Sequence, residues 1–253
     1  MPQTAVRRRS FAVTAASLLV VGLAACTGGS EPASEPEPAG TATDEEIAFD
    51  ARLVASDIPG FEVDPDADDS DGGDPSSAAE DCPTDGPGLE ADHTVALEAL
   101  DGAPSDETAF ESETDVKRLT IGNQVTVLPD VSLAEGAMAF VDDPRLATCM
   151  TEVLATSPEL AGLTVSPVTT APVDAGDQAT SLYLQISGDA AGQPAAIGML
   201  LVFARVDRGL AMFTMSGTER QPTGARALSA EELLDRRAVD AVVGRLAEGL
   251  QDA

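Results

Sequence analysis

Apolar and polar residues alternate along several stretches in the second half of the chain, and this period of two is typical of β-strands. The ranges expected to form strands are 116–128, 163–170, 180–188, 196–206 and 210–215. Asp207-Arg208-Gly209 is a strong turn signal, so the last two strands should form a hairpin. Its first arm is almost continuously apolar and should be the central strand. Gly122-Asn123 fits a turn or bulge within the first range.

Apolar residues spaced three and four positions apart predict helices at the start, middle and end of the folded part. The ranges expected to be helical are 45–54, 133–141, 144–154 and 229–250. Thr43 or Asp44 can cap the first helix, Ser132 the second and Ser229 the last. Pro144 suits the first position of the third helix. The last helix has a continuous apolar stripe, so it should pack on the sheet.

This order of elements predicts an α+β fold in a single domain over residues 47–253. We expect a mainly antiparallel sheet of about five strands, with the flanking helices on one of its faces. Residues 61–63 fit a brief strand, whereas residues 95–100 fit either a strand or a helix. Residues 26–46 contain Gly, Ser, Pro, Glu and Ala with almost nothing to bury, so they should form a disordered tether.

Residues 64–87 are the most polar part of this domain and are rich in aspartate. Clustered carboxylates are the ligands that Ca²⁺ prefers. The EF-hand pattern fails here, because Asp69 or Asp71 occupies the position where the sharp turn needs glycine. We therefore expect an acidic loop without a specific cation site.

The first 25 residues have the pattern of an export signal: Arg7 to Arg9 form a basic region, and an uncharged, mostly apolar segment follows. That segment is shorter than the ~20 residues of a membrane-spanning helix. Leu23-Ala24-Ala25-Cys26 resembles the lipobox of bacterial lipoproteins. The resemblance implies cleavage before Cys26, diacylation of its thiol with chains such as palmitate, and anchoring on the extracytoplasmic face of the cell membrane. Arg8-Arg9-Ser10-Phe11 also resembles the twin-arginine core, so both export routes stay open.

The chain is strongly acidic, with 14 basic and 44 acidic residues and a net charge of −30. Removal of the signal takes away three arginines and no acid, which leaves the mature chain at −33. Such a charge repels phosphate groups and argues against nucleic acid and anionic lipid surfaces as direct partners. Tryptophan is absent and Tyr183 is the only tyrosine, so stacking platforms for sugars or bases are also missing.

Cys82 and Cys149 remain once Cys26 is assigned to lipid, and an even pair in an oxidising compartment predicts a disulfide. Cys149 should lie on the buried side of its helix. The alternative is two free thiols that serve redox or metal chemistry. It lacks the close spacing and the accompanying histidines that such sites use.

Nothing after Cys26 has the pattern of an active site. His93 is the only histidine and adjoins Asp92, but adjacency in sequence does not orient an imidazole for a catalytic triad. The stretch from Thr214 to Gly217 lacks the first glycine of a nucleophile elbow. No phosphate-binding glycine-rich loop occurs between an expected strand and helix. We therefore expect no catalytic residues, no cofactor and no metal site.

The order of elements resembles the extracellular sensor domains of actinobacterial serine/threonine kinases of the PknH type, and the lipoproteins that share that domain. A segment like 125–130 there precedes a helix like 134–141, and a cysteine follows, as Cys149 does here. The resemblance implies an antiparallel sheet flanked by helices and a cleft for a small ligand or an envelope component. This chain departs from the resemblance in two ways. It has cysteines for one disulfide, whereas those ectodomains tend to have two, and it has no kinase domain.

Three functions remain open: a non-catalytic binding or sensor-accessory module, an extracytoplasmic hydrolase with a dispersed site, and a structural envelope protein. We expect the first, with a small molecule, a lipid or an envelope protein as ligand. An apolar pocket lined by the sheet and the final helix would favour binding, and a cleft with strongly perturbed acids around His93 would favour catalysis.

Overall fold

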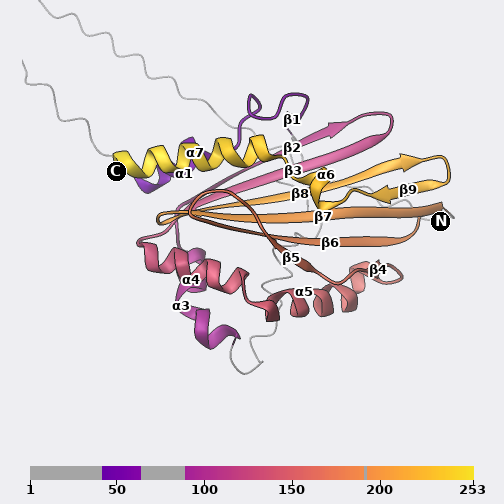
Figure 1. The fold of residues 1–253 in the computed structure, drawn as a ribbon, viewed down its shortest axis with the longest axis horizontal. Helices are drawn as coiled ribbons and strands as arrows, with labels where there is room; N and C mark the ends of the chain where they lie inside the picture. The colour runs from indigo at the N-terminus through magenta and orange to yellow at the C-terminus, as the bar shows by residue number, and fades with distance from the viewer. Residues whose placement is uncertain (1–41, 64–88, 191–192) are drawn as a thin grey trace, which may run out of the picture. The chain divides into compact units, whose positions relative to one another are not determined.

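The computed structural model describes residues 42–63, 89–190 and 193–253, which form an α+β fold around one mainly antiparallel sheet (Figure 1). Its strands are β1 (Glu62–Val63), β2 (Ser105–Glu113), β3 (Lys117–Val127), β4 (Thr164–Val165), β5 (Thr169–Pro172), β6 (Gln178–Ala190), β7 (Gln193–Val206), β8 (Gly209–Gln221) and β9 (Gly224–Ala227). Their order is β1-β2-β3-β8-β7-β6-β4, with β5 paired to β6 and β9 paired to β8.

The sheet is larger than the five strands expected, because it has nine within the described ranges. β2 is too polar for its period of two to stand out, and it pairs along its whole length with β3. β9 is only four residues long and contains no large apolar residue. Neither strand has a pattern of its own, and pairing with a longer neighbour is what stabilises each of them.

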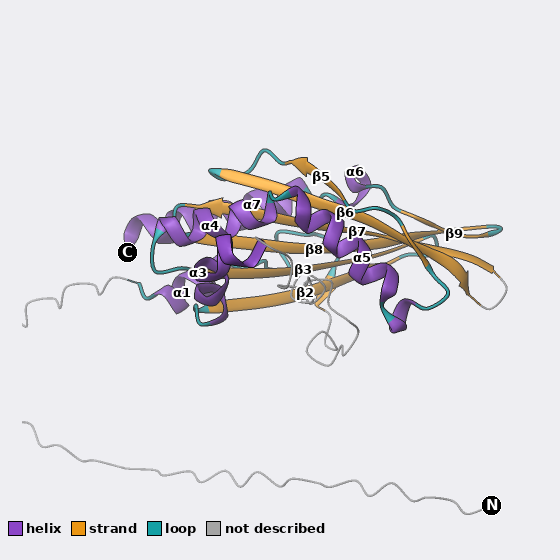
Figure 2. Cartoon of the chain, turned by 90° about the horizontal axis from the view of Figure 1, so that it is seen from below, coloured by secondary structure: helices purple, strands orange, loops and turns teal. Residues whose placement is uncertain are grey.

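Helices cover both faces of the sheet, which corrects the expectation of helices on one face (Figures 1 and 2). They are α1 (Asp44–Ala51), α3 (Leu89–Asp101), α4 (Val131–Val141), α5 (Pro144–Thr156), α6 (Ala230–Leu233) and α7 (Arg236–Asp252). α1, α6 and α7 pack on one face, and α4 and α5 pack on the other. Successive β7 residues show why: Leu200 and Val202 belong to the first core, whereas Leu201 belongs to the second. A strand that is apolar at every position is buried on both sides.

The expected hairpin is confirmed: β7 and β8 pair as far as Val206 and Gly209, and Asp207 takes the left-handed φ of 52° in the connection. The range that fitted either a strand or a helix is helical and belongs to α3. Gly122-Asn123 forms neither a turn nor a bulge, because both residues lie within a continuous β3 that pairs with β2 and β8.

Two of the expected helix caps are wrong. Asp130, not Ser132, caps α4 and accepts a hydrogen bond from the Leu133 N–H, while the Ser132 hydroxyl donates to Asp130. Ser229 caps the short α6, because Leu234 leaves the helical conformation and α7 begins anew behind the cap Asp235. As expected, α7 packs on the sheet, with Val239, Val242 and Leu246 in the core.

α1 is held in place by hydrogen bonds at its first residues and by ion pairs around it. Thr43 and Glu46 form the reciprocal capping box, and Arg208 from the β7–β8 turn binds the Asp44 carboxylate with two hydrogen bonds of 2.6 and 2.9 Å. Arg245 of α7 binds the Asp57 carboxylate just beyond α1. These contacts join α1 and the segment after it to α7 and to the β7–β8 turn.

Several of the expected features lie outside the described residues, among them the signal, Cys26, the acidic loop, Cys82 and the tether as far as residue 41. The end of the expected tether is a correction, because Thr43 caps α1 and residues 44–46 form its first turn. Cys149 lies on α5, half-buried against the core on that side of the sheet. The Cys82–Cys149 disulfide thus stays a prediction. No helix in the described ranges combines the length and the apolar character needed to cross a membrane.

Candidate functional site

A pocket of about 380 Å³ opens between the α7-covered face of the sheet and the connection from α6 to α7. Its lining combines apolar side chains with a polar rim. The apolar part comprises Phe61, Leu119, Ile121, Met215, Leu233 and Leu234, and the polar part comprises Thr120, Glu232, Asp235, Arg236 and Arg237. The lining comes from four separate stretches of the sequence, which only the fold brings together.

The floor of this pocket is the sheet itself. Ile121 of β3 and Met215 of β8 are opposite each other in the strand register, and both side chains are buried. Leu119, two residues before Ile121, lies opposite Gly217. A Cβ at Gly217 would come within 2.8 Å of the Leu119 side chain. The glycine therefore leaves the space that this side chain occupies. The period of two therefore places apolar groups on the floor of the pocket.

The walls are formed at the two ends of the folded chain. Phe61 stands directly before β1, which is fixed to the sheet by its pairing with β2. Leu233 is buried at the end of α6, and Leu234, which follows it, is half-buried. Both ends of the domain therefore contribute to one apolar pocket.

Arg236 and Arg237, the first two residues of α7, form the cationic part of the rim. Arg236 donates to the backbone carbonyl of Asp174 at 2.9 Å, and Arg237 donates to that of Ser56 at 3.4 Å. Neither forms an ion pair with a carboxylate of the described residues, although most arginines there do. Within the described residues, therefore, no carboxylate forms an ion pair with either guanidinium group at this rim.

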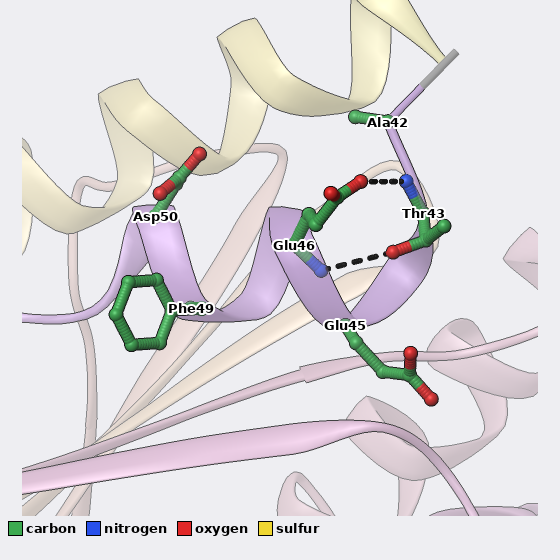
Figure 3. Close-up of a pocket in the computed structure, with 6 residues that line it drawn as sticks. All are labelled: Ala42, Thr43, Glu45, Glu46, Phe49 and Asp50. Atoms are coloured by element: carbon green, nitrogen blue, oxygen red, sulfur yellow. Dashed lines mark hydrogen bonds between the residues drawn. The ribbon is translucent and has the colours of Figure 1, made fainter. Parts of the chain in front are cut away.

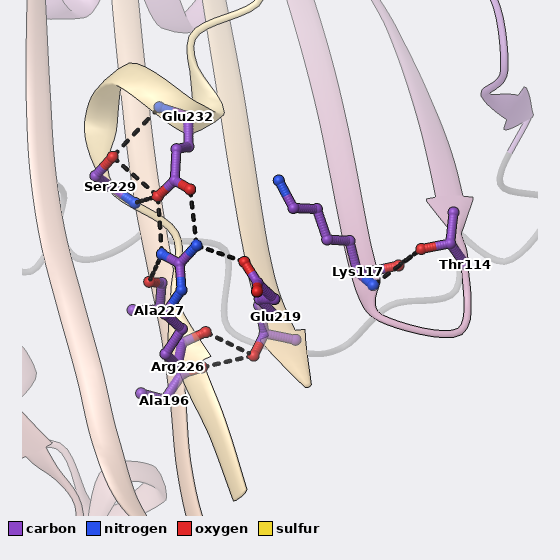
Figure 4. A network of polar contacts seen from close by, with 9 residues as sticks. Thr114, Lys117, Ala196, Glu219, Arg226, Ala227, Ser229 and Glu232 are labelled. Atoms are coloured by element: carbon purple, nitrogen blue, oxygen red, sulfur yellow. Dashed lines mark hydrogen bonds and ion pairs between the residues drawn. The ribbon is translucent and has the colours of Figure 1, made fainter. Parts of the chain in front are cut away.

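The two acids of the rim are already bound to other groups, and Figure 4 shows the contacts of Glu232. Glu232 accepts hydrogen bonds from Arg226 at 2.8 and 2.9 Å and from the Ser229 N–H at 3.0 Å. Arg226, followed by the Ser229 N–H, lowers the pKa of Glu232 well below its usual range. Arg226 also binds Glu219. Asp235 accepts from the Ala238 N–H at 3.1 Å as the cap of α7, so neither carboxylate neutralises the rim arginines.

A second hollow lies along the outer side of α1, where the polar groups serve the helix itself (Figure 3). Thr43 and Glu46 bind each other's backbone N–H groups at 2.8 and 3.3 Å. Phe49 is half exposed and is covered by the Arg52 guanidinium, 3.7 Å from the ring centroid. The hollow is open and shallow, and its best donors and acceptors are used in capping.

His93 lies on α3, next to Phe140 of α4. The imidazole packs edge-to-face on Phe140, with ring centroids 5.7 Å apart. Asp143 caps α5, and its hydrogen bonds with Arg145 lower its pKa to about 2, with a small contribution from the charge of His93. At neutral pH Asp143 is therefore ionised, and its oxygens accept bonds that start the helix.

The described residues also place no three potential metal ligands together. Tyr183, the only tyrosine, donates its hydroxyl to the Leu228 carbonyl at 3.0 Å, and burial, with the charge of Glu232, raises its pKa. Its role there is to hold the segment before α6 against the sheet. The geometry therefore offers an apolar pocket with a cationic rim.

No protein-family model, curated protein or solved structure matches this chain. The sequence analysis did not single out the residues of the pocket. The signal that could have found them is the pair of adjacent arginines at the start of an otherwise well-patterned final helix, next to strands with a clear apolar face.

Proposed function

We propose that this chain is a lipid-anchored, non-catalytic binding module of the bacterial envelope, and that its ligand occupies the pocket beside the α6–α7 connection. The observation that carries the proposal is an apolar pocket with the sheet as its floor and the start of α7 at its rim. Its volume lies within the range of about 300–1,000 Å³ that is usual for small-molecule sites.

The resemblance of the N-terminus to lipoprotein signals supports a place at the cell surface. The resemblance of the remaining chain to kinase sensor domains supports a sensor-accessory role. A hydrolase with a dispersed site has less support, because Asp143 near His93 caps a helix and is fully ionised at neutral pH. A purely structural role gives no reason for an apolar pocket next to two arginines that form no ion pair within the described residues.

A neutral fluorophore tests whether the pocket binds apolar groups. The emission of N-phenyl-1-naphthylamine rises in apolar surroundings, so residues 27–253 should enhance it when titrated with the dye. Leu119→Trp places a larger side chain over the floor and should weaken the affinity at least about tenfold, since most of the apolar contact is lost.

Val116→Trp is the matched control, because Val116 is 56% exposed and lies before β3, outside the pocket. It adds the same ring to the surface and should leave the affinity of the dye unchanged. Thermal unfolding of both variants is measured to check that each of them is folded. Equal dye affinity in Leu119→Trp and the wild type would refute this pocket as the binding site.

A further inference from the structure

We propose that the ligand of this pocket is an anionic amphiphile, an apolar chain with a carboxylate or phosphate head group, and that Arg236 and Arg237 bind the head group. The inference rests on the proposed function and adds the chemical class of the ligand. It starts from the position of two adjacent arginines at the opening of an apolar pocket.

The donors of the two arginines are mostly unused. A guanidinium has five N–H donors in a rigid fork, and each of these two donates one hydrogen bond to a backbone carbonyl in the described structure. The remaining donors can bind a carboxylate or phosphate with two parallel hydrogen bonds, the arrangement in which arginine is most selective. The rim is thus suited to a planar or tetrahedral anion.

The surrounding acids do not satisfy these cations. Glu232 is bound by Arg226, and Asp235 caps α7. Burial would raise the pKa of Asp57, but hydrogen bonds from Arg245 and the Val54 N–H, together with the charges of Arg245 and Arg237, lower it. The Asp57 carboxylate itself is held by Arg245 at 2.9 Å. Arg237 therefore contributes charge to this region without a carboxylate partner of its own.

The placement of these arginines is unfavourable for the helix. The first turn of a helix carries the positive end of the macrodipole, so acids are favoured there and arginines are not. The short α6 follows this rule with Glu231 and Glu232 in its first turn, but α7 begins with Arg236-Arg237 and has no acid in its first turn. Binding of an anion at this end of α7 would compensate both charges.

The charge of the whole chain indicates that the apolar part of the ligand is also needed. A net charge of −30 repels small anions at long range, so two surface arginines alone should not hold acetate or phosphate firmly. Leu119, Ile121 and Met215 offer apolar contact directly beside the cations. A ligand with both parts gains from burial of its chain and from charge-assisted hydrogen bonds of its head group.

A single tryptophan can report occupancy, because the chain has none of its own. Phe61→Trp places the indole in the wall of the pocket, and its emission is titrated with decanoate, decanol and acetate at neutral pH. In this background decanoate should bind at least about tenfold more tightly than decanol, and acetate should leave the emission unchanged.

Arg236→Gln with Arg237→Gln should abolish the preference, so that decanoate binds no more tightly than decanol. The matched control is Lys117→Gln with Arg220→Gln, which removes two other positive charges that form no carboxylate ion pair in the described residues and lie outside the pocket lining. This control should retain the preference.

The outcomes separate the two proposals. Equal affinities for decanol and decanoate would overturn the proposal of an anionic head group. A preference for decanoate that survives in Arg236→Gln with Arg237→Gln would do the same. Neither result contradicts the binding of apolar groups in the pocket. A response to acetate as strong as that to decanoate would replace the amphiphile by a simple anion. If neither decanoate, decanol nor the neutral dye binds, the proposed function fails as well.

Discussion

At the scale of single residues, the buried polar side chains of this protein connect elements rather than form a site. Asn123 is buried in the middle of β3, where its carbonyl oxygen accepts the Leu53 N–H at 2.9 Å and its amide donates to the Met212 carbonyl at 3.1 Å. One amide thus joins the segment after α1 to two strands. Its polarity suggested a turn in the sequence, and its real role appears only in the fold.

Asn123→Ala should lower the free energy of unfolding by roughly 1–3 kcal/mol, because the buried Leu53 N–H loses its acceptor. Chemical denaturation of residues 27–253 measures the change. Gln124→Ala is the control, because Gln124 is next to Asn123 on the opposite face of β3. Its side chain is half-buried and forms no hydrogen bond in the described structure. Its replacement should change the free energy of unfolding by less than about 0.5 kcal/mol. Equal effects at the two positions would contradict this role of Asn123.

At the scale of elements, the segment from β9 to α6 crosses the sheet in close contact with β7. The Leu228 carbonyl lies directly over Gly198, where a Cβ would come within 2.0 Å of its oxygen. The same carbonyl accepts the hydroxyl of Tyr183 from β6. This crossing fixes α6, and α6 leads into the α6–α7 connection that lines the pocket, so a small change at Gly198 acts on the site.

Gly198→Ala should destabilise the domain by about 1–3 kcal/mol, because the backbone at Leu228 has to move away from the sheet. The fluorescence of Tyr183 should change as well, since it is the only tyrosine, there is no tryptophan, and its hydroxyl binds that carbonyl.

Gly122→Ala is the control for Gly198→Ala, because a Cβ at Gly122 in β3 would meet nothing closer than 3.9 Å. It should leave the Tyr183 signal as in the wild type, with a near-neutral effect on stability. A Gly198→Ala protein with wild-type stability and fluorescence would show that the crossing is looser than described.

At the scale of the whole molecule, the proposed lipid anchor would act against the charge of the chain. The mature chain would have a charge of −33 and would be repelled by an anionic membrane surface, so the folded part contributes no attraction of its own. Several acyl chains on Cys26 would more than compensate, at about 0.8 kcal/mol for each buried methylene group. Membrane attachment should therefore depend on one residue.

Cys26→Ser should abolish incorporation of a palmitate analogue during growth, because the serine hydroxyl cannot form the thioether link to the lipid. The label on the purified protein is read by gel fluorescence, and Cys149→Ser is the control that should stay labelled. Undiminished label in Cys26→Ser would disprove the lipoprotein assignment. Location alone is a weaker test, since an uncleaved signal can also hold the chain at the membrane.

Much of the fold could be predicted from local patterns. The period of two in β6, β7 and β8 and the stripe along α7 are strong, because the groups that alternate are large and apolar. β2 was missed since its residues are mostly polar and its stability comes from pairing with β3. Helices on both faces were missed even though the continuous apolar run of β7 is what burial on both sides requires.

By itself, the sequence determined the α+β class, the antiparallel hairpin of β7 and β8 and the packing of α7 on the sheet. Each of these depends on residues close together in the chain. Only the tertiary structure decided the pocket, because Phe61, Leu119 and Arg237 come from distant parts of the sequence. Their proximity follows from strand pairing and from the packing of α6 and α7. The spacing of apolar residues along the chain does not contain this information.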